Sequence, residues 1–114
     1  MPDKDYSGTP LAAKLGATPL AAKLGAKPGT EVLVLFTTSL AELEARFPAL
    51  KATLAPHDGL WVAWPKKAAP IETDLTFEAV QSVGLAHGLV DNKSAAIDES
   101  WQALRFVYRK EDRP

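Results

Sequence analysis

The sequence predicts a small α/β domain, a three-layer Rossmann-like sheet of about four strands, mostly parallel with a C-terminal antiparallel hairpin. Two apolar runs of strand length alternate with two amphipathic stretches of helix length, which gives the order strand, helix, strand, helix. Two further strand-like runs near the C-terminus are separated only by a short turn. A chain of 114 residues is long enough for one such domain with a hydrophobic core.

Residues 9–26 contain the peptide TPLAAKLGA twice in succession. Each copy places Thr at a helix N-cap, Pro at the first helical position and Gly after the last turn, so each copy predicts a short helix. The repeat is too short for a solenoid, so we expect both helices to pack structurally on the domain. Identical copies are typical of a recent duplication, natural or engineered. We expect residues 1–8 to be a flexible N-terminus.

The α/β domain itself is expected over residues 27–109, followed by a frayed tail at residues 110–114. Its first strand is the apolar run EVLVLF, which begins at Glu31 and ends at Phe36. A run with so little polar interruption is typical of a strand that is covered on both faces.

The first helix of the domain is predicted to begin at Ser39, which with Glu42 has the spacing of a capping box. Apolar residues recur along this helix at intervals of three and four, at Leu40, Leu43, Phe47, Leu50 and Leu54. Pro48 lies inside the pattern. Because the apolar stripe continues in phase across Pro48, we expect the helix to bend there.

Residues 60–64 (LWVAW) predict a second buried strand, which Pro65 ends. Trp61 and Trp64 are three positions apart, so they are expected on opposite faces of that strand.

Residues 73–85 predict a second helix, with Gly84 or Gly88 near its end. Residues 89–97 and 102–108 then predict two strands joined by a tight turn.

The charge balance argues against nucleic acid as a main partner, because 13 basic and 14 acidic side chains are spread along the chain, with a net charge of −1. No apolar run approaches the roughly 20 residues that span a bilayer, and residues 1–5 lack a leader pattern, so we expect a cytoplasmic protein without a membrane partner. The chain has no cysteine, and His57 and His87 lie in different regions, so no metal site is expected.

Seven stretches carry a resemblance to a known family. They are residues 6–11 (YSGTPL), 27–29 (KPG), 41–50 (AELEARFPAL), 60–67 (LWVAWPKK), 73–76 (TDLT), 88–93 (GLVDNK) and 98–108. Together they resemble an actinobacterial family of unknown function with a methyltransferase-like Rossmann core. The resemblance covers almost the whole chain, and WPKK and DNK are its more specific segments. It implies a fold and an ancestry, and it implies no activity.

The chain departs from that family by lacking the segment after the first strand. In methyltransferase-like folds this segment holds the glycine-rich loop and the acidic residue that binds a ribose. The sequence contains no GxGxxG-type loop, and no acidic residue ends a second strand. We therefore expect no cofactor, and in particular no S-adenosylmethionine bound in the familiar mode.

The family's strand order would place residues 31–36, 60–64, 102–108 and 89–97 side by side in that order, with the third strand antiparallel. Ligands of open α/β sheets bind at the carboxyl ends of the parallel strands. The candidate ligand-binding residues at this edge are Ser39, Trp64, Lys66, Lys67, Asp98 and Trp101. A helix N-terminus near two lysines suits a small anionic, nucleotide-like ligand, and tryptophan stacks on planar groups. A helix cap and solvated lysines explain the same residues structurally, and no catalytic residue is indicated.

Two functions remain open. The first is a non-enzymatic interaction or regulatory module, in which the apolar strand of residues 31–36 is a sheet edge that pairs with a second copy to form a homodimer. The duplicated helices would instead leave a monomer if they cover that edge. The second is a methyltransferase-like enzyme or a binder of a small anionic ligand. The missing glycine-rich loop favours the first function.

Overall fold

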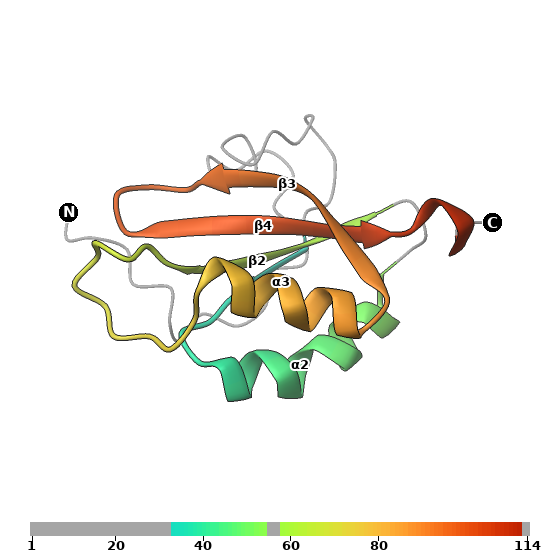
Figure 1. Cartoon of the computed structure of the whole chain (residues 1–114), viewed down its shortest axis with the longest axis horizontal. Helices are drawn as coiled ribbons and strands as arrows, with labels where there is room; N and C mark the ends of the chain where they lie inside the picture. The colour runs from blue at the N-terminus through green and yellow to red at the C-terminus, as the bar shows by residue number, and fades with distance from the viewer. Residues whose placement is uncertain (1–32, 55–57, 113–114) are drawn as a thin grey trace.

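The computed structural model describes residues 33–54 and 58–112 of the chain. These residues form an α/β fold in which two helices pack on a four-stranded mixed sheet (Figure 1). The expectations for residues 1–8, for the duplicated residues 9–26 and for His57 lie outside the described residues, as does the start of the first predicted strand.

The strand order is β1-β2-β4-β3, which is the order that the family resemblance implied. The elements are β1 (Leu33–Phe36), α2 (Leu40–Ala52), β2 (Gly59–Pro65), α3 (Phe77–Ala86), β3 (Leu89–Ala96) and β4 (Trp101–Tyr108), followed by a 3-10 turn at Lys110–Asp112. β1 pairs with β2 in parallel, whereas β4 pairs antiparallel with both β2 and β3. The C-terminal hairpin is thus confirmed. β1, β2 and β3 run in the same direction and β4 runs opposite to them. Of the three strand pairings in the described sheet, only that of β1 with β2 is parallel.

Side chains on the two faces of the sheet form two separate apolar clusters. The helix-side core contains Leu35, Leu43, Phe47, Leu50, Leu54, Leu60, Val62, Trp64, Leu75, Val80, Val83, Leu89, Leu104 and Phe106. The far-side cluster contains Val34, Phe36, Trp61, Ala63, Ile97, Trp101 and Ala103. Both described helices lie on the same face of the sheet (Figure 1), so the described ranges form two layers. As expected, Trp61 and Trp64 face opposite sides.

Helix α2 begins as the sequence predicts, although the capping box is only half formed. The Ser39 side chain accepts a hydrogen bond from the Glu42 backbone N–H at 3.2 Å. The Glu42 carboxylate does not return this bond, because it accepts a hydrogen bond from the Thr37 hydroxyl. Pro48 lies within one continuous helix. Both Pro48 and Glu44 are exposed, and proline has no N–H to donate to the Glu44 carbonyl, so this helical hydrogen bond is missing on the solvent side of α2.

Helix α3 begins at Phe77, and the expected start at Thr73 is wrong by one turn. The Thr73 hydroxyl donates to the Thr38 carbonyl at 2.6 Å, which ties the loop to the segment after β1. The Asp74 carboxylate accepts from the backbone N–H of Leu40 at 2.8 Å, so it caps α2. Thr76 then caps α3 itself. In the sequence, Thr73 and Asp74 resemble the start of the second helix. In the structure, their side chains instead bond to the N-terminal end of α2 and to the segment just before it.

Gly84 lets α3 approach the sheet closely. A Cβ at this position would overlap the ring of Phe106 in β4. Phe106 in turn packs edge-to-face on Phe47 of α2, with ring centroids 5.7 Å apart. Gly88 has a different role, because its φ of 85° lies in the left-handed region just after the end of α3. Gly84 thus allows the close packing of α3 on β4, and Gly88 allows the chain to turn from α3 into β3.

We predict that Gly84→Ala lowers the free energy of unfolding by about 1–3 kcal/mol, because the added methyl group must displace the Phe106 ring. Urea unfolding of the variant measures this loss. Ser82→Ala, at an exposed position of the same helix, is the control and should change stability by less than about 0.5 kcal/mol. Equal stability of Gly84→Ala and the wild type would contradict the close packing of α3 on β4.

Candidate functional site

A cavity of about 580 Å³ opens where β2 ends and α3 begins. It is lined by Trp64, Pro65, Lys66, Lys67, Ile71, Glu72, Thr73, Leu75, Thr76, Phe77, Glu78 and Gln102. We refer to it as the Trp64 cavity. Its position at the carboxyl end of β2 is the place where open α/β sheets bind ligands, and its size lies within the roughly 300–1,000 Å³ range of ligand pockets.

Two aromatic side chains form the apolar part of the Trp64 cavity. Trp64 is the last residue but one of β2 and is only 2% exposed. Phe77 is the first residue of α3 and is 40% exposed. Their ring centroids lie 6.3 Å apart with the planes tilted by 60°. The cavity thus has a rigid buried ring on one side and a solvent-accessible ring on the other.

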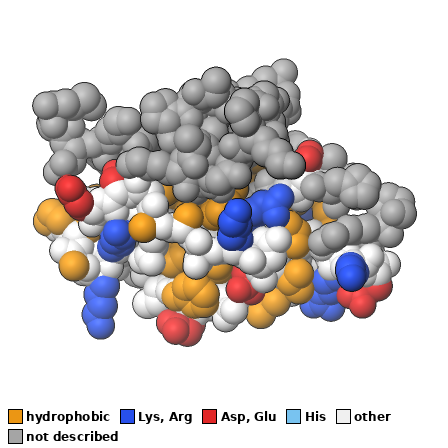
Figure 2. All heavy atoms as spheres, turned by 90° about the horizontal axis from the view of Figure 1, so that it is seen from above, with side chains coloured by type: hydrophobic (Ala, Val, Ile, Leu, Met, Phe, Trp, Pro, Cys, Tyr) orange, Lys and Arg blue, Asp and Glu red, His pale blue; other side chains and the backbone are white. Residues whose placement is uncertain are grey.

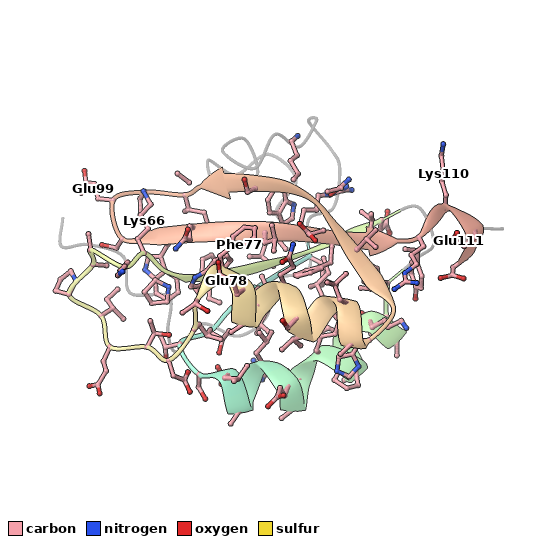
Figure 3. The ribbon with its side chains drawn as sticks, in the orientation of Figure 1. Lys66, Phe77, Glu78, Glu99, Lys110 and Glu111 are labelled. Carbon is pink, nitrogen blue, oxygen red and sulfur yellow. The ribbon has the colours of Figure 1, made fainter. Side chains whose placement is uncertain are left out.

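Charged side chains of both signs line the same cavity. Lys66 and Lys67 follow β2, Glu72 belongs to the loop before α3, and Glu78 lies in the first turn of α3. The loop start is anchored, because the backbone N–H of Lys66 donates to the Ser100 carbonyl at 2.8 Å. Figure 3 shows Phe77 and Glu78 together at the start of α3, with Lys66 on the same side of the molecule.

A second, smaller hollow of about 260 Å³ lies next to the Trp64 cavity. We call it the Ser94 hollow. It is lined by Ser94, Ala95, Ala96 and Ala103, and it shares Trp64, Lys66, Phe77 and Gln102 with the Trp64 cavity. Three of these residues are brought together by strand pairing, because Gln102 of β4 lies opposite both Trp64 of β2 and Ala96 of β3. Phe77 therefore stands between two hollows on the helix-side face.

Three of the six residues predicted from the sequence come together at this site. Trp64, Lys66 and Lys67 all line the Trp64 cavity. Ser39 does not line it, since its hydroxyl caps α2.

Asp98 and Trp101 also lie away from the Trp64 cavity. The Asp98 carboxylate accepts the backbone N–H groups of Ser100 and Trp101 at 2.8 and 2.9 Å, which closes the turn between β3 and β4. The Trp101 side chain belongs to the far-side cluster, where it packs edge-to-face on Phe36 with centroids 5.6 Å apart. One step along β4, Gln102 faces the cavity in its place.

Sequence reasoning missed Phe77 and Gln102. The alternation of side chains along β4 is a signal for Gln102, because the neighbour of a buried far-side Trp101 must face the helices. Phe77 was hidden by the early expected helix start, which treats it as an ordinary position within the second helix.

The remaining polar features of the described ranges have structural explanations. The His87 ring stacks on Phe47 at 5.1 Å, and the His87 carbonyl accepts a hydrogen bond from Lys51, so this histidine joins α2 to the end of α3. Residues 33–54 and 58–112 contain no cluster of three or more potential metal ligands, and no helix there is long and apolar enough to cross a membrane. On the face shown in Figure 2, positive and negative side chains are interspersed.

Asp98 should contribute to stability through its two backbone hydrogen bonds. We predict that Asp98→Ala lowers the free energy of unfolding by about 1–2 kcal/mol, because two turn N–H groups lose their acceptor. Asp98→Asn keeps an acceptor oxygen and should lose less. Denaturant unfolding compares the two variants, and an Asp98→Ala protein as stable as the wild type would contradict this structural role.

Comparisons with protein-family models, with curated proteins and with solved structures return no match to this chain. The assignment of a function therefore rests on the geometry of the chain's own residues.

Proposed function

We propose that this chain is a non-enzymatic interaction module that pairs with a second copy of itself through β1. The observation that carries the proposal is the difference between the two edges of the sheet. β1 and β3 are the outer strands of the described sheet, yet only β3 has the features that natural proteins use to prevent edge pairing.

The β3 edge is protected in two ways. Its pairing with β4 is interrupted by a register shift between Asp91 and Lys93, so Asn92 forms a bulge. The side chains of Asn92, Lys93 and Ser94 are exposed, which places polar groups and a positive charge along this edge. A second strand cannot easily align with such an edge.

Within the described residues, the β1 strand carries neither a bulge nor a charged side chain. Its sequence LVLF contains no charged residue and no proline, and its register with β2 is regular from Leu33 to Phe36. The Thr37 N–H donates to the Ala63 carbonyl in β2, so by strand alternation the backbone groups of Val34 point away from β2. They point in the direction from which another strand would approach.

A second copy is the occupant that the geometry favours. Two β1 strands related by a twofold axis pair antiparallel, which produces an isologous interface and a sheet that continues from one copy into the other. An apolar strand of four residues offers no side-chain charge that would select a different partner.

We predict that the wild-type chain is a dimer, that Val34→Pro is a monomer, and that Val34→Ala remains a dimer. Proline removes the Val34 N–H, which points away from β2, and leaves the β1–β2 ladder intact. Alanine is the matched control, because it shortens the buried side chain but keeps the N–H. Light scattering over a concentration series measures the mass, and circular dichroism verifies that each variant is folded.

A wild-type chain that is monomeric at every concentration would contradict the proposed pairing. A folded Val34→Pro variant that remains dimeric would contradict it as well, because the interface would then lie elsewhere.

We further propose that the sheet is a reduced Rossmann-like core related to the methyltransferase-like family named above. The order β1-β2-β4-β3 and the parallel pair joined through α2 support this relationship.

A second candidate function is the binding of a small ligand in the Trp64 cavity. The observation that favours it is the convergence of Trp64, Lys66 and Lys67, which the sequence alone selects as candidates, on one cavity at the carboxyl end of β2. The homodimer and the ligand site are compatible, because β1 does not line this cavity.

A further inference from the structure

The Trp64 cavity is lined by one exposed aromatic ring, Phe77, and one buried ring, Trp64. Phe77 and Leu85 are the large apolar side chains of the described ranges that remain exposed, at 40% and 42%, and both belong to α3. A phenylalanine that stays 40% exposed forgoes part of the stabilisation that full burial would give. Phe77 differs from Leu85 because it lines two adjoining hollows and faces the Trp64 ring. An aromatic group placed in the cavity would contact both rings.

The charges around this aromatic pair are balanced. Lys66 and Lys67 line the cavity together with Glu72 and Glu78. No ion pair joins any of these four side chains to another group of the described ranges. A purely anionic ligand would approach as many carboxylates as ammonium groups and gain little net attraction. A ligand with one charge of each sign can place its carboxylate near the lysines and its ammonium near the glutamates.

We propose that the Trp64 cavity binds a small zwitterion with an aromatic side chain, namely an aromatic α-amino acid. The proposal rests on the second candidate function, ligand binding in this cavity, and it replaces the anionic, nucleotide-like ligand expected from the sequence. The aromatic group of the ligand contacts Trp64 and Phe77. Its carboxylate lies near the two lysines of the cavity and its ammonium near the two glutamates. Gln102 completes the polar lining from β4.

Four probes test the ligand class by isothermal titration of the full-length chain. L-Phenylalanine carries both charges, 3-phenylpropanoate carries only the carboxylate, and 2-phenylethylamine carries only the ammonium. Adenosine monophosphate represents the anionic, nucleotide-like class. We expect L-phenylalanine to bind at least about tenfold more tightly than either singly charged analogue, since each lacks one of two charge contacts.

The outcomes separate this proposal from the function on which it rests. Tighter binding of 3-phenylpropanoate or of adenosine monophosphate than of L-phenylalanine would overturn the zwitterion and leave ligand binding standing. Failure of all four probes to bind at millimolar concentration would overturn both.

Matched variants test the location. Phe77→Ala should weaken L-phenylalanine binding at least about fivefold, whereas Leu85→Ala, equally exposed on the same helix, should change it by less than about twofold. Equal effects of the two substitutions would overturn the assignment of the ligand to the Trp64 cavity. Thermal unfolding of both variants shows whether either one is destabilised.

Paired charge variants test the orientation. The double substitution Glu72→Gln and Glu78→Gln should weaken binding of L-phenylalanine, because its ammonium loses both carboxylates, and should tighten binding of 3-phenylpropanoate, because the carboxylates that repel this anion are gone. The control is Lys110→Ala with Glu111→Gln, exposed residues at the opposite end of the molecule (Figure 3), which should alter neither. A glutamate variant that binds both probes as the wild type does would overturn the ammonium contact.

Discussion

Burial of β2 on both faces is the constraint on which the rest of this structure depends. Leu60, Val62 and Trp64 pack into the helix-side core, whereas Trp61 and Ala63 pack into the far-side cluster. Strand neighbours are required on both sides as well, because every interior backbone group must be paired. β1 supplies one neighbour in parallel and β4 the other in antiparallel orientation. The mixed sheet follows from the position of this one strand.

The two candidate functional surfaces, the β1 edge and the Trp64 cavity, lie at the margins of the sheet around β2. β1 is the outer neighbour of β2 in the described sheet, and its described residues are apolar and without a bulge, so it is the edge that the proposed pairing uses. At the carboxyl end of β2, the loop to α3 leaves Trp64 at the base of a cavity because α3 starts only at Phe77. The edge and the cavity therefore have a common origin in β2 and its connections.

Much of the fold follows from features that are local in the sequence. The strand runs, the cap at Ser39 and the hairpin are set by periodicity and by turn residues close in the chain, and the structure contains them all. The start of α3 was predicted wrongly because the side chains of Thr73 and Asp74 bond to residues more than 30 positions earlier. No local pattern reveals such partners. The same error concealed Phe77, which acquires its place in the cavity only when the helix begins there.

The sequence alone could predict the part of the candidate site that comes from the end of β2. Trp64, Lys66 and Lys67 share a cavity because they are consecutive or nearly so at the end of β2. Trp101 was expected beside them because it is near the same sheet edge, but the side chain lies on the other face. The face of a residue on β4 depends on its register with β2, which pairs Gln102 with Trp64. That register is a property of the folded sheet.

Residue-resolved hydrogen exchange of the full-length chain under native conditions tests the central role of β2 most directly. We expect the amides of β2 and β4 to exchange most slowly, since both strands have a neighbour on each side and apolar cover from the two clusters. Amides of β3, at the protected and more polar edge, should exchange faster. Exchange of the β2 amides as fast as those of β3 would contradict a sheet organised around β2.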